Sequence, residues 1–171
     1  VAIVTYAGQA GVALQSTKAS EKAKIIAALD GLESGGSTAG AQGIITAYQI
    51  AKENFITKGN NRVILATDGD FNVGISDNQS LEKLIEEKRS TGIFLSVLGY
   101  GMGNYQDDKM QILADKGNGN HAYIDNMQEA NKVLHNEFGG TMYTIAKDAK
   151  SQIAPTPATL RPHPLAGHPP R

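Results

Sequence analysis

Two kinds of apolar pattern alternate along the chain, and their periods predict its secondary structure. Runs of consecutive apolar residues, typical of buried strands, cover residues 1–6, 11–16, 62–68, 93–101 and 121–125. Longer stretches with apolar residues on one helical face cover residues 20–33, 41–56, 80–92, 107–119 and 125–138. Strands that alternate with helices of about ten to fifteen residues are typical of βαβ units. The sequence therefore predicts an α/β fold, with a mainly parallel sheet and helices on both faces.

Local patterns make this prediction more specific. Residues 1–6 and 62–68 have few polar interruptions, so we expect both strands to be buried on both faces. A glycine-containing turn separates residues 1–6 from 11–16, which predicts a hairpin. The apolar residues of the first helix fall roughly on one stripe, formed by Ala23, Ile26, Ala27, Leu29 and Leu32.

Three helix ends carry capping signals. Gly92 closes the helix at 80–92 as a residue suited to the left-handed conformation. Asn104 is the predicted N-cap of the helix at 107–119. Asp125 and Gln128 have the spacing of a capping box at the start of the last helix.

The two ends of the chain differ from its middle. Val1 already lies in a strand-like run, so we expect the start to be a cut made by processing or by design of the expressed chain. All six prolines fall between Pro155 and Pro170. We therefore divide the chain into a domain at 1–150 and a proline-rich tail at 151–171, which is either non-native in origin or a linker to another domain.

Composition removes several classes of function. The chain has 171 residues and a net charge of −1, so no basic excess exists to bind nucleic acid or an anionic membrane. It has no cysteine, which excludes disulfides, thiolate metal sites and a cysteine nucleophile. No apolar run approaches the roughly 18 residues of a membrane span. One soluble-type domain with a core of its own is expected.

Polar residues converge where predicted strands end. Asp68 ends the strand at 62–68, Thr38 belongs to a GGST loop before a helix, and a glycine-rich loop covers 99–105. In open α/β sheets, ligands bind beyond the carboxyl ends of the strands. A hydroxyl and a carboxylate suit Mg²⁺, Mn²⁺ or Ca²⁺ rather than zinc or copper. Two alternatives stay open at this point: Ser37 or Thr38 simply caps a helix, and Asp-Gly simply forms a turn.

The sequence VILATDGDFNVG (63–74), with GGST (35–38) upstream, resembles the von Willebrand factor type A domain. The likeness is closest to bacterial secreted or lipoprotein members, and it runs from Val1 to about Lys150. It implies a Rossmann-like fold with one antiparallel edge strand and an extracytoplasmic location, periplasmic or at the cell surface. It also implies a metal-ion-dependent adhesion site, in which a divalent ion is completed by an acidic residue of a protein ligand.

The resemblance assigns the metal ligands residue by residue. Thr38 matches the family's threonine and Asp68 its aspartate, and Gly36, Ser37, Gly69 and Asp70 belong to the same loops without being counted as ligands. Rim contacts are expected from residues nearby: Phe71, Asn72, Tyr100, Asn104 and Tyr105. The family's Asp-x-Ser-x-Ser motif is absent from this sequence, so the site is incomplete. We expect this chain to bind Mg²⁺, Mn²⁺ or Ca²⁺ weakly or not at all.

The family's first strand and helix would lie before Val1, and that strand lies between the strands at 1–6 and 62–68. Three arrangements remain open: these two strands pair directly, a second copy donates a strand, or two open edges meet in a dimer. We expect self-association, by domain swapping or by edge pairing.

Three functions are weighed. The first is a non-enzymatic, adhesion-type module that binds a protein. The second is a Mg²⁺-dependent phosphohydrolase using Asp68 and Asp70, which lacks the several carboxylates and the base that such chemistry needs. The third is a fragment without a function of its own.

Overall fold

The computed structural model describes residues 1–6, 11–33, 35, 40–68, 78–100 and 107–137. Its strands are β1 (Ile3–Thr5), β2 (Gly11–Leu14), β3 (Arg62–Thr67), β4 (Phe94–Tyr100) and β5 (His121–Ile124). Its helices are α1 (Lys22–Asp30), α2 (Gly40–Glu53), α3 (Asn78–Ser90), α4 (Asp107–Lys116) and α5 (Met127–Asn131). A π-helical segment, Lys132–Glu137, directly follows α5. The expected tail at 151–171 lies outside the described residues.

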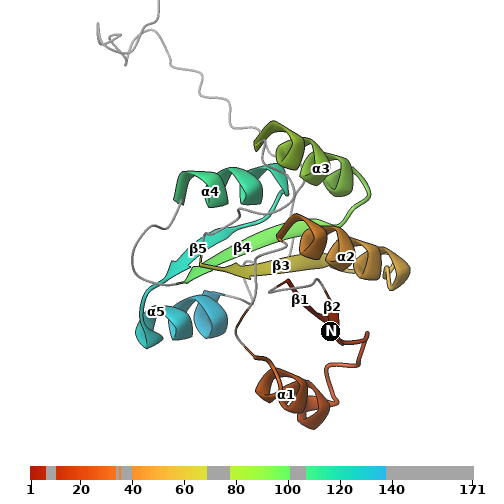
Figure 1. Ribbon diagram of the computed structural model, residues 1–171, viewed down its shortest axis with the longest axis vertical. Coiled ribbons are helices and arrows are strands. Elements are labelled where there is room, and N and C mark those ends of the chain that lie inside the picture. The colour runs from red at the N-terminus through yellow and green to blue at the C-terminus, as the bar shows by residue number, and fades with distance from the viewer. Residues whose placement is uncertain (7–10, 34, 36–39, 69–77, 101–106, 138–171) are drawn as a thin grey trace, which may run out of the picture.

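The strands form two separate sheets. β1 and β2 pair as an antiparallel hairpin, as predicted. β3, β4 and β5 form a parallel sheet in that order. Helices α2, α3 and α4 lie over one face of the parallel sheet, called here the upper face, and α1 and α5 lie on the side of the other, lower face (Figure 1). The predicted α/β, Rossmann-like architecture with helices on both sides and an antiparallel strand is confirmed.

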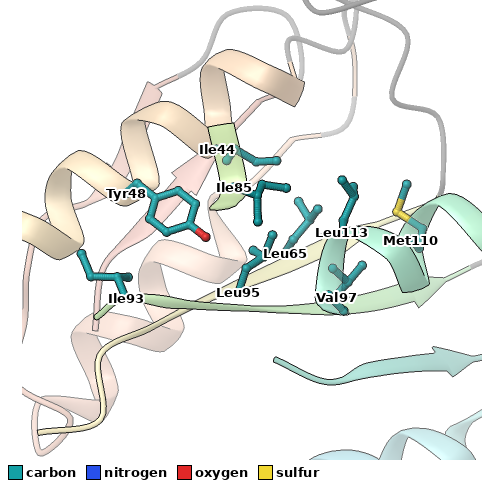
Figure 2. Packing of buried hydrophobic residues seen from close by; sticks show 10 residues of the cluster. Ile44, Tyr48, Leu65, Ile85, Ile93, Leu95, Val97, Met110 and Leu113 are labelled. Atoms are coloured by element: carbon teal, nitrogen blue, oxygen red, sulfur yellow. The ribbon is translucent and has the colours of Figure 1, made fainter. Parts of the chain in front are cut away.

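The hydrophobic core lies on the upper face of the sheet. Leu65, Leu95 and Val97 point from the strands toward the helices, because alternate residues of a strand face the same side (Figure 2). The core cluster consists of Ile44, Tyr48, Leu65, Ile85, Ile93, Leu95, Val97, Met110, Leu113 and Ala114. The apolar stripes of α2, α3 and α4 therefore face this core, as their helical periods predicted.

The helix ends confirm one capping prediction and correct another. Gly92 adopts φ 85°, a left-handed conformation that favours glycine, two residues after Ser90, the last residue of α3. At α5 the N-cap is Asn126, whose side chain accepts a hydrogen bond from the Glu129 backbone N–H at 2.8 Å. The predicted capping box of Asp125 and Gln128 was therefore wrong by one residue. Adjacent Asp and Asn are both good N-caps, so sequence alone does not choose between them. Asn104, the other predicted cap, lies outside the described residues.

The expectation of strands buried on both faces was wrong. In β3, Leu65 and Thr67 are buried toward the helices, whereas Ile64 is 40% exposed on the lower face. In β1 no residue is buried, and Val1 just before it is exposed. These apolar positions therefore lack the neighbours that their sequence pattern anticipates.

The first helix also departs from expectation. No residue of α1 is buried, and Ile26, Leu29 and nearby Leu32 are exposed, so this stripe does not face the core. Its weak contacts are with β2.

One edge of β3 is open. β4 pairs with the other edge, and within the described residues no strand, β1 included, pairs with this one. The hydrogen bond from the Phe94 N–H to the Asn61 carbonyl shows which residues turn their backbone groups toward β4. Because backbone groups alternate between the two edges in a parallel ladder, Arg62, Ile64 and Ala66 turn their N–H and C=O groups to the open edge.

In the described part of the chain, no helix has both the length and the apolarity to cross a membrane.

Replacing Tyr48 with phenylalanine should stabilise the domain. The Tyr48 hydroxyl is buried among apolar side chains and has no hydrogen-bond partner among the described residues (Figure 2). An unsatisfied buried hydroxyl costs about 1 kcal/mol or more, so Tyr48→Phe should raise the free energy of unfolding by about that amount. Urea titration measures it. Tyr6→Phe is the matched control: it removes a hydroxyl that has an acceptor, and it should lower stability instead.

The same hydroxyl predicts an alkaline loss of stability. Burial raises the pKa of Tyr48 well above its ordinary value. An unfolded tyrosine loses its proton near pH 10, at about its ordinary pKa, whereas the folded one keeps it to higher pH. The stability gained by keeping Tyr48 neutral is therefore complete below about pH 10 and is lost as pH rises through the folded pKa. Unfolding free energies measured from pH 8 upward should fall above about pH 10 in the wild type and less steeply in Tyr48→Phe. Parallel profiles would contradict this.

Candidate site at the carboxyl end of β3

Asp68 directly follows β3, at the edge of the parallel sheet where its strands end. Its side chain is exposed, whereas the preceding Thr67 is buried. Thr67 is level with Gly99 of β4, so Asp68 comes level with Tyr100 at the same edge. Asp68 therefore lies at the carboxyl end of its strand, as the sequence pattern predicts, and its role as a ligand stays a prediction.

Tyr6 brings the hairpin to this edge. Its hydroxyl donates a hydrogen bond to the Ala66 carbonyl at 2.5 Å, across the gap between β1 and β3. Its stem packs on the start of α2, where a Cβ added to Gly43 would lie 2.6 Å from the Tyr6 Cβ. Glycine at 43 is therefore what lets the hairpin approach α2 so closely. The first turn of α2 and the carboxyl end of β3 are thus connected through one side chain.

The electrostatics of this edge connect Tyr6 with its neighbours. Burial raises the pKa of the Tyr6 hydroxyl, and the nearby negative charge of Asp68 raises it further. A hydrogen bond with the Thr67 side chain acts in the opposite direction and lowers this pKa. Tyr6, Thr67 and Asp68 therefore form one interacting group in which the tyrosine stays neutral at physiological pH. Burial also raises the pKa of Tyr100 at the end of β4.

The structure describes only two of the predicted site and rim residues, Asp68 and Tyr100. The others lie outside the described residues: Gly36, Ser37, Thr38, Gly69, Asp70, Phe71, Asn72, Asn104 and Tyr105. The proximity of Thr38 and Asp68 therefore stays a prediction.

The described residues offer too few oxygen ligands at this edge to coordinate a divalent cation by themselves. Asp68 contributes one carboxylate, and the hydroxyl of Tyr6 already donates to Ala66. In the described ranges, no group of three or more His, Cys, Asp or Glu side chains is placed to hold a metal ion. Mg²⁺ prefers octahedral oxygen coordination and keeps several waters, so these residues need further ligands.

Sequence reasoning missed Tyr6 and Thr67 as members of this site. Both residues end strand-like runs, and this pattern placed them at the same edge of the sheet as Asp68. Nothing in the sequence indicated the contact between Tyr6 and Gly43. A polar-tipped aromatic at the end of an otherwise apolar run was the available signal.

The parallel sheet, its covering helices and an acid beyond the end of β3 define a Rossmann-like α/β domain with its candidate ligand edge at the strand ends. The sequence model of the von Willebrand factor type A domain matches residues 1–137, and the chain belongs to this family. Such domains are commonly protein-interaction modules, are generally not enzymes and are often extracellular.

Three known proteins illustrate the relationship. The uncharacterized protein YfbK of Escherichia coli (strain K12) is 48% identical over 168 residues, covering 98% of this chain and 29% of YfbK. The chain therefore spans less than a third of this relative's length.

The other two are solved structures that share the fold. The SpRpn10 VWA domain aligns with a TM-score of 0.62 at 15% identity, over 85% of this chain and 75% of that one. Proximal thread matrix protein 1 from the mussel byssus was solved with a zinc-occupied metal-ion-dependent adhesion motif. It aligns with a TM-score of 0.55 at 18% identity, over 78% of this chain and 34% of that one.

Gly43→Ala should disrupt the contact that holds the hairpin at this edge. The new methyl group would meet the Tyr6 Cβ, which is a fixed stem and not a flexible end. Overpacking of this kind costs about 1–3 kcal/mol, and we expect a net loss even after the helix-propensity gain of about 1 kcal/mol from alanine. Urea titration measures the loss.

A double-mutant cycle supplies the control. Tyr6→Gly removes the opposing Cβ, so Gly43→Ala in that background should be neutral or stabilising. An equal cost in both backgrounds would show that the methyl group clashes with something else.

Proposed function

We propose that this chain contributes to a protein-binding module, whose ligand site lies at the carboxyl end of β3 and includes a divalent metal in the full-length protein. The observation that carries the proposal is the exposed Asp68 carboxylate at that edge. Asp68 is also close enough to Tyr6 for its negative charge to raise the pKa of the Tyr6 hydroxyl, which supports its membership in this group of residues. A carboxylate so placed can share a cation with an acidic residue of a protein ligand.

Thr38 is the proposed second metal ligand. It precedes α2 by two residues, and the first turn of α2 is connected to the end of β3 through Tyr6. This connection supports a position for Thr38 near Asp68. Gly36, Ser37, Gly69 and Asp70 would shape the two loops, and Phe71, Asn72, Tyr100, Asn104 and Tyr105 would form the rim.

The metal is proposed to be Mg²⁺, Mn²⁺ or Ca²⁺, bound weakly by this chain and tightly by a chain that supplies the remaining ligands. The mussel protein carries zinc in the corresponding motif, so zinc belongs in any titration. A bacterial source and an extracytoplasmic location are part of the same proposal, suggested by the resemblance to secreted family members and by the relative from Escherichia coli.

A Mg²⁺-dependent phosphohydrolase is the alternative function. Hydrolysis assisted by a metal needs several carboxylates and an activated water, and in the described part of the chain Asp68 is the acid placed at this edge. Incubation with a phosphate ester and Mg²⁺ separates the two proposals: steady turnover that Asp68→Asn abolishes would favour the enzyme.

Self-association is a second proposal, supported by the open edge of β3. In the described part of the chain, Arg62 and Ile64 turn backbone groups to this edge, where the Ala66 carbonyl already accepts a hydrogen bond from Tyr6, and Ile64 is exposed beside it. Unpaired backbone groups next to apolar surface favour contact with another chain. Light scattering that gives a monomer up to millimolar concentration would contradict this proposal.

Metal titration tests the site. Mn²⁺ should broaden backbone NMR signals of Thr67, Asp68 and the first turn of α2, with a dissociation constant weaker than about 10 μM because the oxygen shell is incomplete. Asp68→Asn should abolish the broadening. Asp115→Asn, an exposed acid on α4, is the matched control and should leave it unchanged. Tighter binding would contradict the incomplete shell, and broadening centred elsewhere would contradict the site.

Peptide selection tests the function. Phage-displayed peptides selected on the wild-type chain in millimolar Mg²⁺ should carry an acidic residue. Their binding should be lost on chelation and in Asp68→Asn but kept in Asp115→Asn. Selected peptides that bind independently of the metal and of Asp68 would overturn the proposed function.

A further inference from the structure

The turn between α4 and β5 ends the helix with a Schellman motif. The Asn118 N–H donates to the Asp115 carbonyl at 3.1 Å, and the Gly119 N–H donates to the Ala114 carbonyl at 2.9 Å. Asn118 adopts φ 53°, the left-handed conformation that this motif needs. Asparagine tolerates this conformation better than most residues with a side chain, so it suits position 118.

The next position has no room for a side chain. A Cβ added to Gly119 would lie 1.8 Å from the Leu95 carbonyl oxygen and 2.9 Å from the Ser96 backbone nitrogen. Both atoms belong to the backbone of β4, the middle strand of the parallel sheet, so they cannot move aside. The packing of this turn on β4 therefore requires glycine directly after Asn118.

The two residues that the turn requires form a chemically reactive pair. An asparagine followed by glycine is especially prone to deamidation, because glycine has no Cβ to hinder attack by its backbone nitrogen on the asparagine side chain. Asn118 is the only asparagine in the sequence that precedes a glycine. The residue is exposed, so water reaches its side chain.

Deamidation at this pair has two steps. The Gly119 nitrogen bonds to the Asn118 Cγ, and the side-chain amide group leaves as ammonia together with the proton of the Gly119 N–H. Water then opens the resulting succinimide ring and gives aspartate or isoaspartate. Isoaspartate places one additional methylene group in the backbone.

The native turn opposes the first step. The Gly119 N–H donates to the Ala114 carbonyl, and an amide held in this way gives up its proton less readily. Attack also requires the peptide group between Asn118 and Gly119 to rotate toward the side chain, which breaks this hydrogen bond. The following residue is held as well, because the Asn120 carbonyl accepts a hydrogen bond from the Val97 N–H at 2.8 Å.

We propose that Asn118 is a deamidation site that the native turn keeps closed and that local opening of the α4–β5 turn exposes. The reaction places a carboxylate at the negative end of the α4 dipole. Isoaspartate also lengthens a turn that has no spare room against β4. Both products destabilise the closed turn, so the reaction makes a transient opening permanent. This site is independent of the proposed ligand site, because the turn precedes β5 and lies at the opposite edge of the sheet.

Timed incubation tests the protection. Mass spectrometry of digested samples measures conversion at Asn118 in the native chain, in the urea-unfolded chain and in a peptide of residues 114–121. The native chain should react at least about tenfold more slowly than the peptide, and the unfolded chain should match the peptide in the same urea. Asn118→Gly, which keeps a residue suited to the left-handed turn, should abolish the signal. Equal rates in the native chain and the peptide, or an unreactive unfolded chain, would overturn the proposal.

A pair of helix variants tests whether the opening is local. Lys116→Gly weakens the last turn of α4 directly before Asn118, and Lys88→Gly makes the same substitution in the last turn of α3. Lys116→Gly should speed deamidation of the native chain about fivefold, whereas Lys88→Gly should leave its rate close to that of the wild type. Circular dichroism first establishes that both variants are folded. Equal acceleration in the two variants, or none in Lys116→Gly, would overturn local opening as the step that exposes Asn118.

Discussion

The hydrogen bond from the Tyr6 hydroxyl to the Ala66 carbonyl connects two sheets that, in the described part of the chain, share no backbone ladder. Without it, the β1–β2 hairpin would contact the rest of the domain chiefly through α2 and α1. The bond ends beside Asp68, so the same tyrosine that positions the hairpin also borders the candidate ligand edge. One side chain therefore links the hairpin, the candidate ligand edge and the glycine in α2 against which it packs.

The stability of the domain comes from a core that is built on one side of the sheet. Helices α2, α3 and α4 bury their apolar stripes against β3 and β4. The Lys116–Glu86 ion pair joins α4 to α3 at 2.7 Å, and it raises the pKa of Lys116 and lowers that of Glu86. Both groups are solvent-exposed, so this pair adds little compared with the apolar contacts beneath it.

Much of the architecture follows from the sequence, because period and turn chemistry are local properties. The parallel strands, the first hairpin, the glycine cap after α3 and the position of Asp68 at the strand ends all follow from short patterns. Burial was predicted less well. Ile64 and the stripe of α1 have core-like sequences, yet they face water here because burial depends on neighbours that a local pattern does not contain. The contact of Tyr6 with Gly43 joins residues far apart in the chain, so no local pattern shows it.

Arg62 has a consequence for how the chain behaves before it reaches any partner. Within the described residues, β3 is an apolar segment with no strand paired to one edge, the combination that favours cross-β aggregation. A cation at the first position of this strand acts as a gatekeeper, since stacking β3 segments in register would bring like charges together. The charge at the start of β3 therefore disfavours in-register stacking of this strand between chains.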